Sequence, residues 1–380
     1  MKIGFDGKRA VCNNTGLGNY SRLLVGVLSR RYPENDYVLY SPEMRHNPRL
    51  QPLLTQSNVT VATPDGTAGK AIPALWRVAG MARQMTREGV DLIHGLSGEL
   101  PFDTPSAGLP SVVTMHDLIF RRFPEYYKTV DRKIYDYKFR KAAEMSTRII
   151  AISACTKRDL INDYGIDEAK IDVVYQGCDA QFHRTPAATE IEAIKKKYGL
   201  SRPYIISVGT IERRKNQILA VKGLRGLPAE FDVVLVGRRT EYAATIDSYA
   251  AANSLRNRIK FIENAPFGDL PALYAGAVCS SYTSRYEGFG IPVIESLHAG
   301  TPPVIATGSC LEEAGGPATP AVEPDDVEAW VNAVKEIITY PDVRAGIVKA
   351  GKAHVQRFND DAMATGTMAT YRAAIDTHLT

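Results

Sequence analysis

The chain has 380 residues, of which 44% are hydrophobic and 23% charged, and this composition excludes a disordered chain, a collagen-like chain and a coiled coil. The length exceeds what one hydrophobic core usually serves, so we expect two domains. The formal net charge is only +4, so any attraction to nucleic acid or anionic lipid must come from a local basic patch.

Short apolar, β-branched runs alternate along the chain with segments of helical spacing. In chain order, the predicted strands are Lys2–Asp6, Tyr37–Ser41, Val59–Thr63, Asp91–Gly95, Ser111–Asp117, Arg148–Ser153 and Ile171–Tyr175, followed by Tyr204–Gly209, Phe231–Gly237, Ile259–Glu263, Ala277–Tyr282 and Pro303–Thr307. The runs show no alternation with polar residues, which is typical of strands covered on both faces. The pattern predicts parallel sheets joined by crossover helices.

The pattern restarts near residue 180, after a polar segment that contains Pro186. We therefore predict an α/β fold of two Rossmann-like domains, residues 1–180 and 181–358, whose parallel sheets face each other across a cleft. A final helix is predicted over residues 359–380. Because ligands of such sheets bind outside the carboxyl ends of the strands, the cleft would hold two substrates.

The five cysteines indicate neither a disulfide framework nor a zinc site. Their number is odd, and no two of them form a Cys-x-x-Cys pair, so we expect thiols in a reducing compartment and no metal site. No apolar run approaches the ~18 residues that span a bilayer, and the first residues lack a signal-peptide pattern. We expect a cytoplasmic protein, or one on the cytoplasmic face of a membrane.

A glycine-containing loop, Asn14–Tyr20, follows the first predicted strand and leads into a helix. Glycines let the backbone approach a ligand closely, and the amino terminus of a helix favours anionic groups. The spacing differs from the nicotinamide fingerprint, in which Gly-x-Gly-x-x-Gly follows the strand directly. A tight turn without a ligand is the alternative for this loop.

The strongest motif runs from Tyr286 to Glu295 and reads Tyr-Glu-Gly-Phe-Gly-Ile-Pro-Val-Ile-Glu. Pro292 suits the first turn of a helix, so we expect Gly288–Ile291 to form a loop whose N–H groups hold a phosphate. Glu287 precedes the loop and Glu295 is expected in the first turn. One carboxylate would reach a group ahead of the phosphates and the other a group behind them, as in a nucleotide sugar.

A second motif, Gly209–Asn216, follows the first predicted strand of the second domain. It places Arg213, Arg214 and Lys215 near the carboxyl end of that strand. An arginine fork and a lysine point charge both suit a diphosphate. For Arg213, a solvated basic turn is a fair alternative.

Together these motifs resemble family 4 of the retaining glycosyltransferases, which have the GT-B fold. The segment from Glu287 to Glu295 matches the family's E-x7-E motif, and Gly209–Asn216 resembles its diphosphate-binding stretch. The remaining similar segments are Asn14–Tyr20, Thr114–Asp117 with its histidine, and the interdomain junction Val174–Asp179. A departure is Thr210, where many members carry arginine, which leaves Arg214 and Lys215 as the principal diphosphate cations.

The resemblance implies a role for each matching residue. Glu295 would bind the ribose hydroxyls, and Arg214 and Lys215 would stabilise the leaving nucleoside diphosphate. Glu287, with the backbone N–H groups of Phe289, Gly290 and Ile291, would hold the hexose and phosphates, with Gly209 in the same donor-binding region. Gly16 would let the amino-terminal loop close over the donor, and His116 would lie at the reacting centre.

The activity implied is transfer of a hexose from a nucleoside-diphosphate sugar to a glycan or lipid-linked glycan. The segments around His116 and Arg214 look most like bacterial mannosyltransferases that extend surface polysaccharide from GDP-mannose. No cofactor is expected, and no metal, because the chain contains no Asp-x-Asp. Two alternatives are a sugar-nucleotide epimerase of similar architecture and a non-catalytic nucleotide-sugar binding protein.

The positive charge is concentrated in Arg121–Arg148, which holds nine basic and four acidic residues interleaved with aromatic ones. Such a helix could lie on anionic lipid, or it could be a solvated helix whose aromatics pack inward. No nucleic-acid motif accompanies it, so a nucleic-acid partner is not expected. Among the other histidines, His94 could line the cleft or serve as a hydrogen-bonded structural residue, and His298 is expected to pack or cap.

Overall fold

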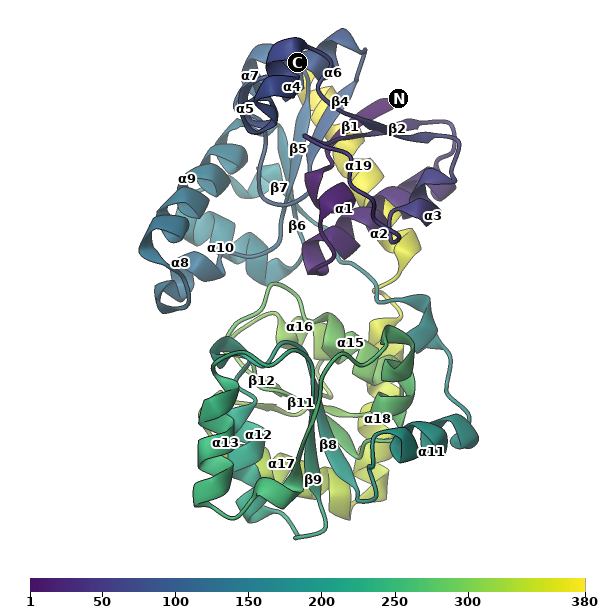
Figure 1. Cartoon of the computed structure of the whole chain (residues 1–380), viewed down its shortest axis with the longest axis vertical. Helices are drawn as coiled ribbons and strands as arrows, with labels where there is room; N and C mark the ends of the chain where they lie inside the picture. The colour runs from purple at the N-terminus through teal and green to yellow at the C-terminus, as the bar shows by residue number, and fades with distance from the viewer. Residues whose placement is uncertain (380) are drawn as a thin grey trace. The chain divides into compact units, whose positions relative to one another are not determined.

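The computed structural model describes residues 1–379, which form two compact units. Unit 1 holds residues 1–176 together with the chain from Asn359 onward, and unit 2 holds Gly177–Phe358. Each unit has its own parallel sheet with helices on both faces (Figure 1). The predicted α/β fold of two Rossmann-like domains is confirmed.

The sheet of unit 1 has the strand order β3-β2-β1-β4-β5-β6-β7. Its strands are β1 (Lys2–Asp6), β2 (Asp36–Tyr40), β3 (Val59–Ala62), β4 (Leu92–Gly95), β5 (Ser111–Met115), β6 (Arg148–Ala151) and β7 (Ile171–Val173). The helices are α1 (Lys8–Cys12), α2 (Gly16–Arg31), α3 (Gln51–Leu54), α4 (Thr67–Ala71), α5 (Pro73–Ala79), α6 (Met81–Arg87), α7 (Thr104–Ala107), α8 (Ile119–Arg122), α9 (Thr129–Met145), α10 (Ala154–Tyr164) and α19 (Asp360–Leu379).

The sheet of unit 2 repeats this topology with the order β10-β9-β8-β11-β12-β13. Its strands are β8 (Tyr204–Val208), β9 (Asp232–Val236), β10 (Ile259–Ile262), β11 (Cys279–Tyr282), β12 (Pro303–Ala306) and β13 (Ala321–Val322). The helices are α11 (Ala188–Lys197), α12 (Ile218–Gly223), α13 (Ala243–Ala252), α14 (Leu270–Ala275), α15 (Ile291–His298), α16 (Leu311–Gly315), α17 (Val327–Thr339) and α18 (Pro341–Val355). Strand β13 was not predicted, because two residues are too few to show a pattern.

The burial of the strands explains why apolar and polar residues do not alternate along them. Every residue of β9 is buried, and Val233 and Leu235 belong to the core of unit 2 together with Trp330 of α17. Trp330 Nε1 donates a hydrogen bond to Ser281 Oγ at 3.0 Å, so its one polar group is satisfied inside the core. Helices thus cover both faces of the sheet and leave its strand ends as the place for polar side chains.

The last helix, α19, packs on unit 1 against α2 and the strands β5, β6 and β7. Its Tyr371 Oη lies 2.6 Å from Nδ1 of His94, whose Nε2 lies 2.8 Å from Thr114 Oγ1. Burial lowers the pKa of His94 to about 3, so the ring is neutral. His94 is therefore the hydrogen-bonded structural residue, and the alternative of a residue lining the cleft does not hold.

The segment Asn14–Tyr20, predicted as a loop, is for the most part helical, which corrects that prediction. Helix α2 begins at Gly16, and only the residues up to Thr15 lie outside it. A Cβ on Gly18 would lie 2.0 Å from the carbonyl oxygen of Asn13, so this glycine allows the chain before α2 to pack against the helix. Within residues 1–379, no helix is both long and apolar enough to cross a lipid bilayer.

Candidate active site

The two predicted donor motifs follow neighbouring strands of unit 2. Strands β8 and β11 pair at the centre of the sheet, where the strand order changes direction. The Gly209 segment follows β8, and the Glu287 segment follows β11. Ligands of doubly wound sheets bind at this position, outside the carboxyl ends of the two strands.

Ion pairs join the two motifs. Glu287 Oε2 lies 2.8 Å from Arg214 Nη1, and Glu287 Oε1 lies 2.5 Å from Lys215 Nζ. Arg214 also donates hydrogen bonds to the carbonyl of Tyr286 and to Glu212 Oε1, both at 2.7 Å. The three charged side chains of this ionic cluster, Arg214, Lys215 and Glu287, are only 14–20% exposed.

The cations determine the charge state of Glu287. Burial alone would raise the pKa of this carboxyl, but Lys215 and Arg214 outweigh burial and lower its pKa to about 2. The carboxylate is therefore ionised at neutral pH and balances one of the two positive charges. With the carboxylate of Glu212, which also pairs with Arg214, the two cations are balanced, so an anion that binds at the strand ends must compete with these carboxylates.

The residues before α15 place the amino terminus of this helix beside the ionic cluster. Gly290 has φ +120°, and a Cβ there would lie 3.0 Å from Leu311 Cδ2, so glycine is needed at this position. The ring of Phe289 is buried and packs edge-on against Phe358 at 5.2 Å. The first N–H groups of α15 have no acceptor within their own helix, and this end of the helix dipole attracts anions.

Gly209 occupies a second positive-φ position, at +141° directly after β8. A Cβ on Gly209 would lie 3.9 Å from Lys215 Cε, so the aliphatic part of Lys215 passes over this glycine. Lys215 ends a short 3-10 helix, Arg213–Lys215, in which Arg213 is exposed. The exposure of Arg213 agrees with the solvated turn considered as its alternative.

Glu295 is the fifth residue of α15, not a residue of its first turn as predicted. Its side chain is buried, and Tyr274 Oη donates a hydrogen bond to Oε2 at 3.3 Å. Tyr274 Oη lies 2.6 Å from Tyr282 Oη, which donates to the carbonyl of Val208 at 3.1 Å. Burial raises the pKa of Glu295 to about 7, although the bond from Tyr274 lowers it.

The hydroxyls of Tyr274 and Tyr282 were not predicted as part of the site. They join Glu295 to the carboxyl end of β8, so the carboxylate is held at the same sheet edge as the ionic cluster. Tyr282 is the last residue of β11, and this position at a strand end could have indicated from the sequence that it belongs to the site. Tyr274 lies in α14, where its spacing is that of a core residue, so the sequence gives no sign of its contact.

His116 and Gly16 belong to unit 1. His116 follows β5 directly, and its Nε2 lies 3.0 Å from the carbonyl of Leu96, to which it must donate. Burial lowers the pKa of His116 to about 4, so the ring is neutral and Nδ1 carries the lone pair. The ring of Tyr20, from α2, packs edge-on against His116 at 4.6 Å, whereas a Cβ on Gly16 would contact nothing within 4 Å.

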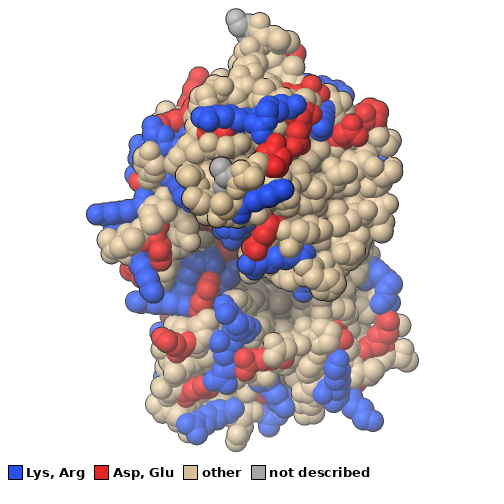
Figure 2. Space-filling model, turned by 45° about the horizontal axis from the view of Figure 1, so that its top comes forward, with Lys and Arg blue, Asp and Glu red and all other residues tan. Residues whose placement is uncertain are grey.

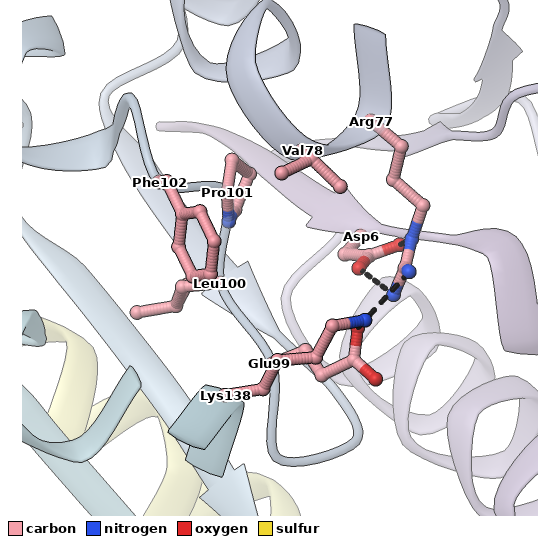
Figure 3. A pocket seen from close by; sticks show the side chains of 8 residues that line it. All are labelled: Asp6, Arg77, Val78, Glu99, Leu100, Pro101, Phe102 and Lys138. Carbon is pink, nitrogen blue, oxygen red and sulfur yellow. Dashed lines mark hydrogen bonds and ion pairs between the residues drawn. The ribbon is translucent and has the colours of Figure 1, made fainter. Parts of the chain in front are cut away.

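A charged pocket lies at the corresponding switch point of unit 1, between β1 and β4 (Figure 3). Arg77 binds Asp6, the last residue of β1, at 2.5 Å and Glu99, which follows β4, at 3.0 Å. Lys138 of α9 lies 3.4 Å from Glu99, and Phe102 also lines the pocket. These residues were not expected from the sequence to form a group.

The basic segment Arg121–Arg148 forms α8, a 3-10 turn and α9, and its aromatics divide between two environments. Tyr127 and Phe139 pack against the core of unit 1. Val130, Ile134 and Tyr137 are exposed and lie three and four residues apart, so they share one face of α9. In Figure 2, lysine and arginine side chains gather along the left side, on which Figure 1 draws α8 and α9.

Sequence relatives of the chain include bacterial polysaccharide enzymes. It is 24% identical over 251 residues to the O-antigen chain mannosyltransferase RfbU of Salmonella typhimurium, a match that covers 66% of each chain. It is 25% identical over 287 residues, or 74% of each chain, to the O-antigen chain mannosyltransferase B of Escherichia coli. A D-inositol 3-phosphate glycosyltransferase of Salinispora arenicola is 27% identical over 248 residues, 60% of this chain and 55% of that enzyme.

Solved structures share the fold over nearly the whole chain. HepE from Anabaena, solved with UDP and glucose, has a TM-score of 0.76 and 20% identity, and the match covers 98% of this chain and 100% of HepE. The sucrose-phosphate synthase of Thermosynechococcus elongatus has a TM-score of 0.73 and 18% identity, with 98% of each chain covered. At these identities the likeness shows the GT-B fold.

Two family descriptions match the two halves of the chain. Residues 15–182 match "Glycosyltransferase Family 4", and residues 190–354 match "Glycosyl transferases group 1". The second range contains the ionic cluster and the whole of α15. The protein is a glycosyltransferase, with a family 4 region in its first half and a group 1 region in its second.

Proposed function

We propose that the protein is a retaining glycosyltransferase that moves mannose from GDP-mannose to a glycan or a lipid-linked glycan of a surface polysaccharide. The observation that carries this proposal is the ionic cluster of Arg214, Lys215 and Glu287 beside the amino terminus of α15. A nucleoside diphosphate is the ligand whose charge and size suit two cations and a helix terminus. The two O-antigen mannosyltransferase relatives support mannose as the sugar.

The donor would bind along the sheet edge of unit 2. Its diphosphate would accept hydrogen bonds from Arg214, Lys215 and the first N–H groups of α15. The ribose hydroxyls would donate to Glu295 further along the same helix. The hexose would then project past Glu287, which completes the order sugar, diphosphate, ribose and base.

Glu287 has two tasks in this proposal. Before the donor binds, its carboxylate neutralises part of the charge of Arg214 and Lys215 and holds both in position. When the diphosphate arrives, phosphate oxygens take over some of these bonds, and the carboxylate turns to the hexose hydroxyls. The cations are therefore arranged before catalysis and need little reorganisation during it.

The chemical step breaks the bond between the anomeric carbon and the phosphate oxygen. Negative charge grows on the diphosphate while the sugar becomes oxocarbenium-like, so Arg214, Lys215 and the helix terminus stabilise the leaving group. They supply the positive charge for which other enzymes use a divalent metal, which supports transfer without a metal or another cofactor. Retention would follow if the acceptor attacks on the face that the diphosphate leaves and passes its proton to the diphosphate.

His116 would act at the donor sugar rather than as a general base. Its ring is neutral, and Nε2 donates to Leu96, so Nδ1 can accept a hydrogen bond from a sugar hydroxyl. A neutral ring of fixed orientation positions the hexose without changing charge during the reaction. Gly16, at the exposed start of α2, leaves room for a ligand to approach the backbone.

The acceptor would bind to unit 1. The pocket of Asp6, Arg77, Glu99 and Lys138 offers carboxylates and cations to sugar hydroxyls at the switch point of that sheet. Lys138 belongs to α9, so the pocket adjoins the helix with the exposed apolar face. A lipid-linked acceptor would be reached if α9 makes a peripheral contact with an anionic membrane.

The experiment is a donor screen followed by product analysis. Thermal shift with GDP-mannose, UDP-glucose and ADP-glucose should show the largest stabilisation with GDP-mannose, because a ligand that binds only the folded chain raises its Tm. The purified chain should then transfer labelled mannose to a glycan acceptor in the presence of a chelator. Interconversion of the donor without an acceptor would instead indicate an epimerase, and binding without any turnover would indicate a non-catalytic protein.

A further inference from the structure

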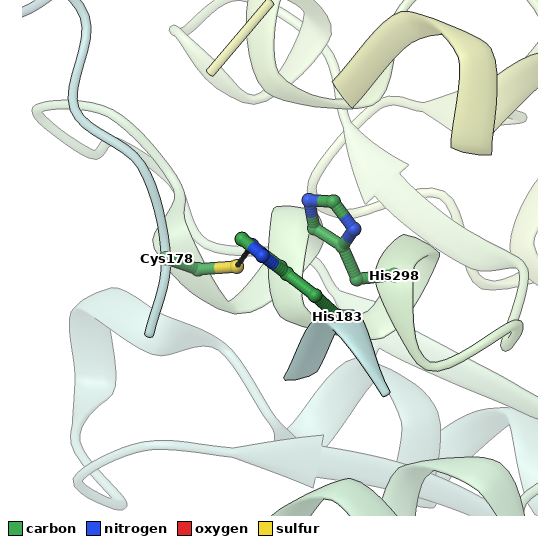
Figure 4. Close-up of side chains that lie close together, drawn as sticks. All are labelled: Cys178, His183 and His298. Carbon is green, nitrogen blue, oxygen red and sulfur yellow. Dashed lines mark hydrogen bonds between the residues drawn. The ribbon is translucent and has the colours of Figure 1, made fainter. Parts of the chain in front are cut away.

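Unit 2 brings together three side chains that can bind a metal: Cys178, His183 and His298 (Figure 4). Cys178 lies at the start of the unit, His183 ends the 3-10 helix Ala180–His183, and His298 is the last residue of α15. Cys178 Sγ lies 3.7 Å from His183 Nε2, and the two imidazole rings are 4.4 Å apart. One donor atom from each residue lies within 4.8 Å of the others.

One ring nitrogen of His298 is available to bind a ligand. Its Nε2 is shielded from solvent and has no hydrogen-bond partner among the residues that the structure describes. An unsatisfied buried nitrogen costs about 1–3 kcal/mol, so such groups are rare without a reason. Cys178 is buried as well, whereas His183 is exposed and can change its rotamer.

The donor set and its dimensions suit zinc. Thiolate sulfur and imidazole nitrogen are the ligand types that Zn²⁺ binds in proteins. A tetrahedral ion with bonds of about 2.0–2.3 Å keeps its ligand atoms about 3.3–3.8 Å apart. The distance between Cys178 Sγ and His183 Nε2 already fits this range, and all three donor atoms lie within 4.8 Å of one another.

We propose that Cys178, His183 and His298 form a zinc site that is separate from the transfer chemistry. The thiolate charge would offset the nearby cation Lys352, whose positive charge acts on His298. The ion would fix the first residues of unit 2 to the end of α15, the helix that carries Glu295. The proposal differs from the expectation drawn from the cysteines alone, because the other two ligands are histidines and one of them is remote in sequence.

The test uses the full-length chain without a histidine tag, stripped of metal. Titration with Zn²⁺ against a chromophoric chelator should show one equivalent bound with a submicromolar Kd. Cys178→Ser, His183→Ala and His298→Ala should each weaken binding at least tenfold. Cys12→Ser, which removes a half-exposed thiol of unit 1, is the matched control and should bind as the wild type does.

Co²⁺ provides a second readout that identifies the sulfur ligand. The wild-type chain should show a thiolate-to-cobalt charge-transfer band, and this band should be absent in Cys178→Ser. Zn²⁺ should also raise the Tm of the wild type and of Cys12→Ser by a few degrees, but not that of His183→Ala. Because His183 is exposed, its variant should fold normally, and circular dichroism in a chelator checks this.

Absence of stoichiometric binding would overturn the proposal. Retention of wild-type affinity in Cys178→Ser or in His183→Ala would overturn it equally. None of these readouts depends on glycosyl transfer, so failure of the zinc site would leave the proposed activity untouched.

Discussion

Glu287 Oε2 lies 2.8 Å from Arg214 Nη1, and this ion pair connects the loops that follow β8 and β11. The two strands are neighbours at the switch point of the sheet of unit 2. A single carboxylate thus fixes the two cations that we propose to bind the donor diphosphate.

In the proposed reaction, replacing Lys215 by alanine removes a cation from the leaving group. We expect kcat to fall about 10²–10³-fold, as for the loss of one preorganised charge-stabilising donor, with a smaller change in the apparent KM for the donor. Steady-state kinetics with saturating acceptor measures both constants. Arg213→Ala, in the same turn but exposed, is the control and should retain wild-type kcat. Near-normal turnover of Lys215→Ala would remove this residue from leaving-group stabilisation.

Glu287→Gln should destabilise the fold in a pH-dependent way. The folded-state pKa of Glu287, about 2, lies below the ordinary value of 4.5, so its stabilisation is present above about pH 4.5 and is lost as the pH falls towards 2. The difference in unfolding free energy from wild type should be at most about 3 kcal/mol at neutral pH and should shrink on acidification. Urea denaturation at several pH values measures it.

Asp325→Asn is the matched control for this experiment. Asp325 pairs with Arg285, but its side chain is 77% exposed. An exposed pair contributes about 0–1 kcal/mol, so the variant should stay close to wild type at every pH. A pH-independent effect of Glu287→Gln would contradict the assigned charge state.

Glu295→Gln should show the opposite dependence. The folded-state pKa of Glu295, about 7, lies above its ordinary 4.5, so the carboxyl favours the folded state below about pH 4.5 and this contribution is lost as the pH rises through 7. The glutamine variant should therefore be more stable than wild type at about pH 8, by at most about 3 kcal/mol, and equal to it in acid. Denaturation curves at both pH values test this directly.

The same carboxyl should control donor affinity. In the proposed complex an ionised Glu295 would accept hydrogen bonds from both ribose hydroxyls, so the apparent KM of the wild type for the donor should fall as the pH rises through about 7. In Glu295→Ala the KM for the donor should be higher than in the wild type and should not change with pH across this range. The increase in KM should exceed the decrease in kcat. A pH-dependent KM in the alanine variant would assign the titration to another group.

Two glycines of α2 should respond differently to alanine. A Cβ at Gly18 would lie 2.0 Å from the carbonyl oxygen of Asn13, so Gly18→Ala should lower the stability by about 1–3 kcal/mol. A Cβ at Gly16 would have no heavy atom within 4 Å, so Gly16→Ala should fold with wild-type stability. If the segment around Gly16 closes over the donor, the Gly16→Ala variant should still bind the donor less tightly than the wild type does. Equal stability of the two variants would contradict the packing described here.

The apolar face of α9 should govern attachment to lipid. The wild-type chain should sediment with vesicles of anionic lipid at low salt, because basic residues near such a surface contribute about 1 kcal/mol each. Ile134→Glu should reduce sedimentation strongly, whereas Glu168→Gln, at an exposed carboxyl of unit 1 outside this helix, should leave it unchanged. A wild-type chain that stays in the supernatant would contradict the peripheral contact.

Much of the fold could be predicted from the sequence because parallel strands carry a strong local signal. The run Asp232–Val236 is buried on both faces of the sheet, so nearly all of its residues are apolar and the strand is easy to recognise in the sequence. Some element ends depend on single contacts, and one of them, the start of α2, was predicted wrongly. The start of α2 at Gly16 depends on the approach of Asn13 to Gly18, which no periodicity encodes.

Some contacts of the candidate site could likewise be predicted from the sequence, and others could not. Arg214, Lys215 and Glu287 could be brought together from sequence because each follows a central strand, and such strands end at one edge. The support of Glu295 by Tyr274 and the cluster of Cys178, His183 and His298 could not, since these contacts join residues from distant helices and loops. Only the packed structure determines which of their side chains meet.

The most direct test of the account is a structure of the chain with GDP-mannose bound. The account predicts diphosphate oxygens within hydrogen-bonding distance of Arg214, Lys215 and the first N–H groups of α15, with the ribose hydroxyls on Glu295. A nucleotide bound elsewhere on the chain, with the Glu287 ion pairs undisturbed, would contradict it.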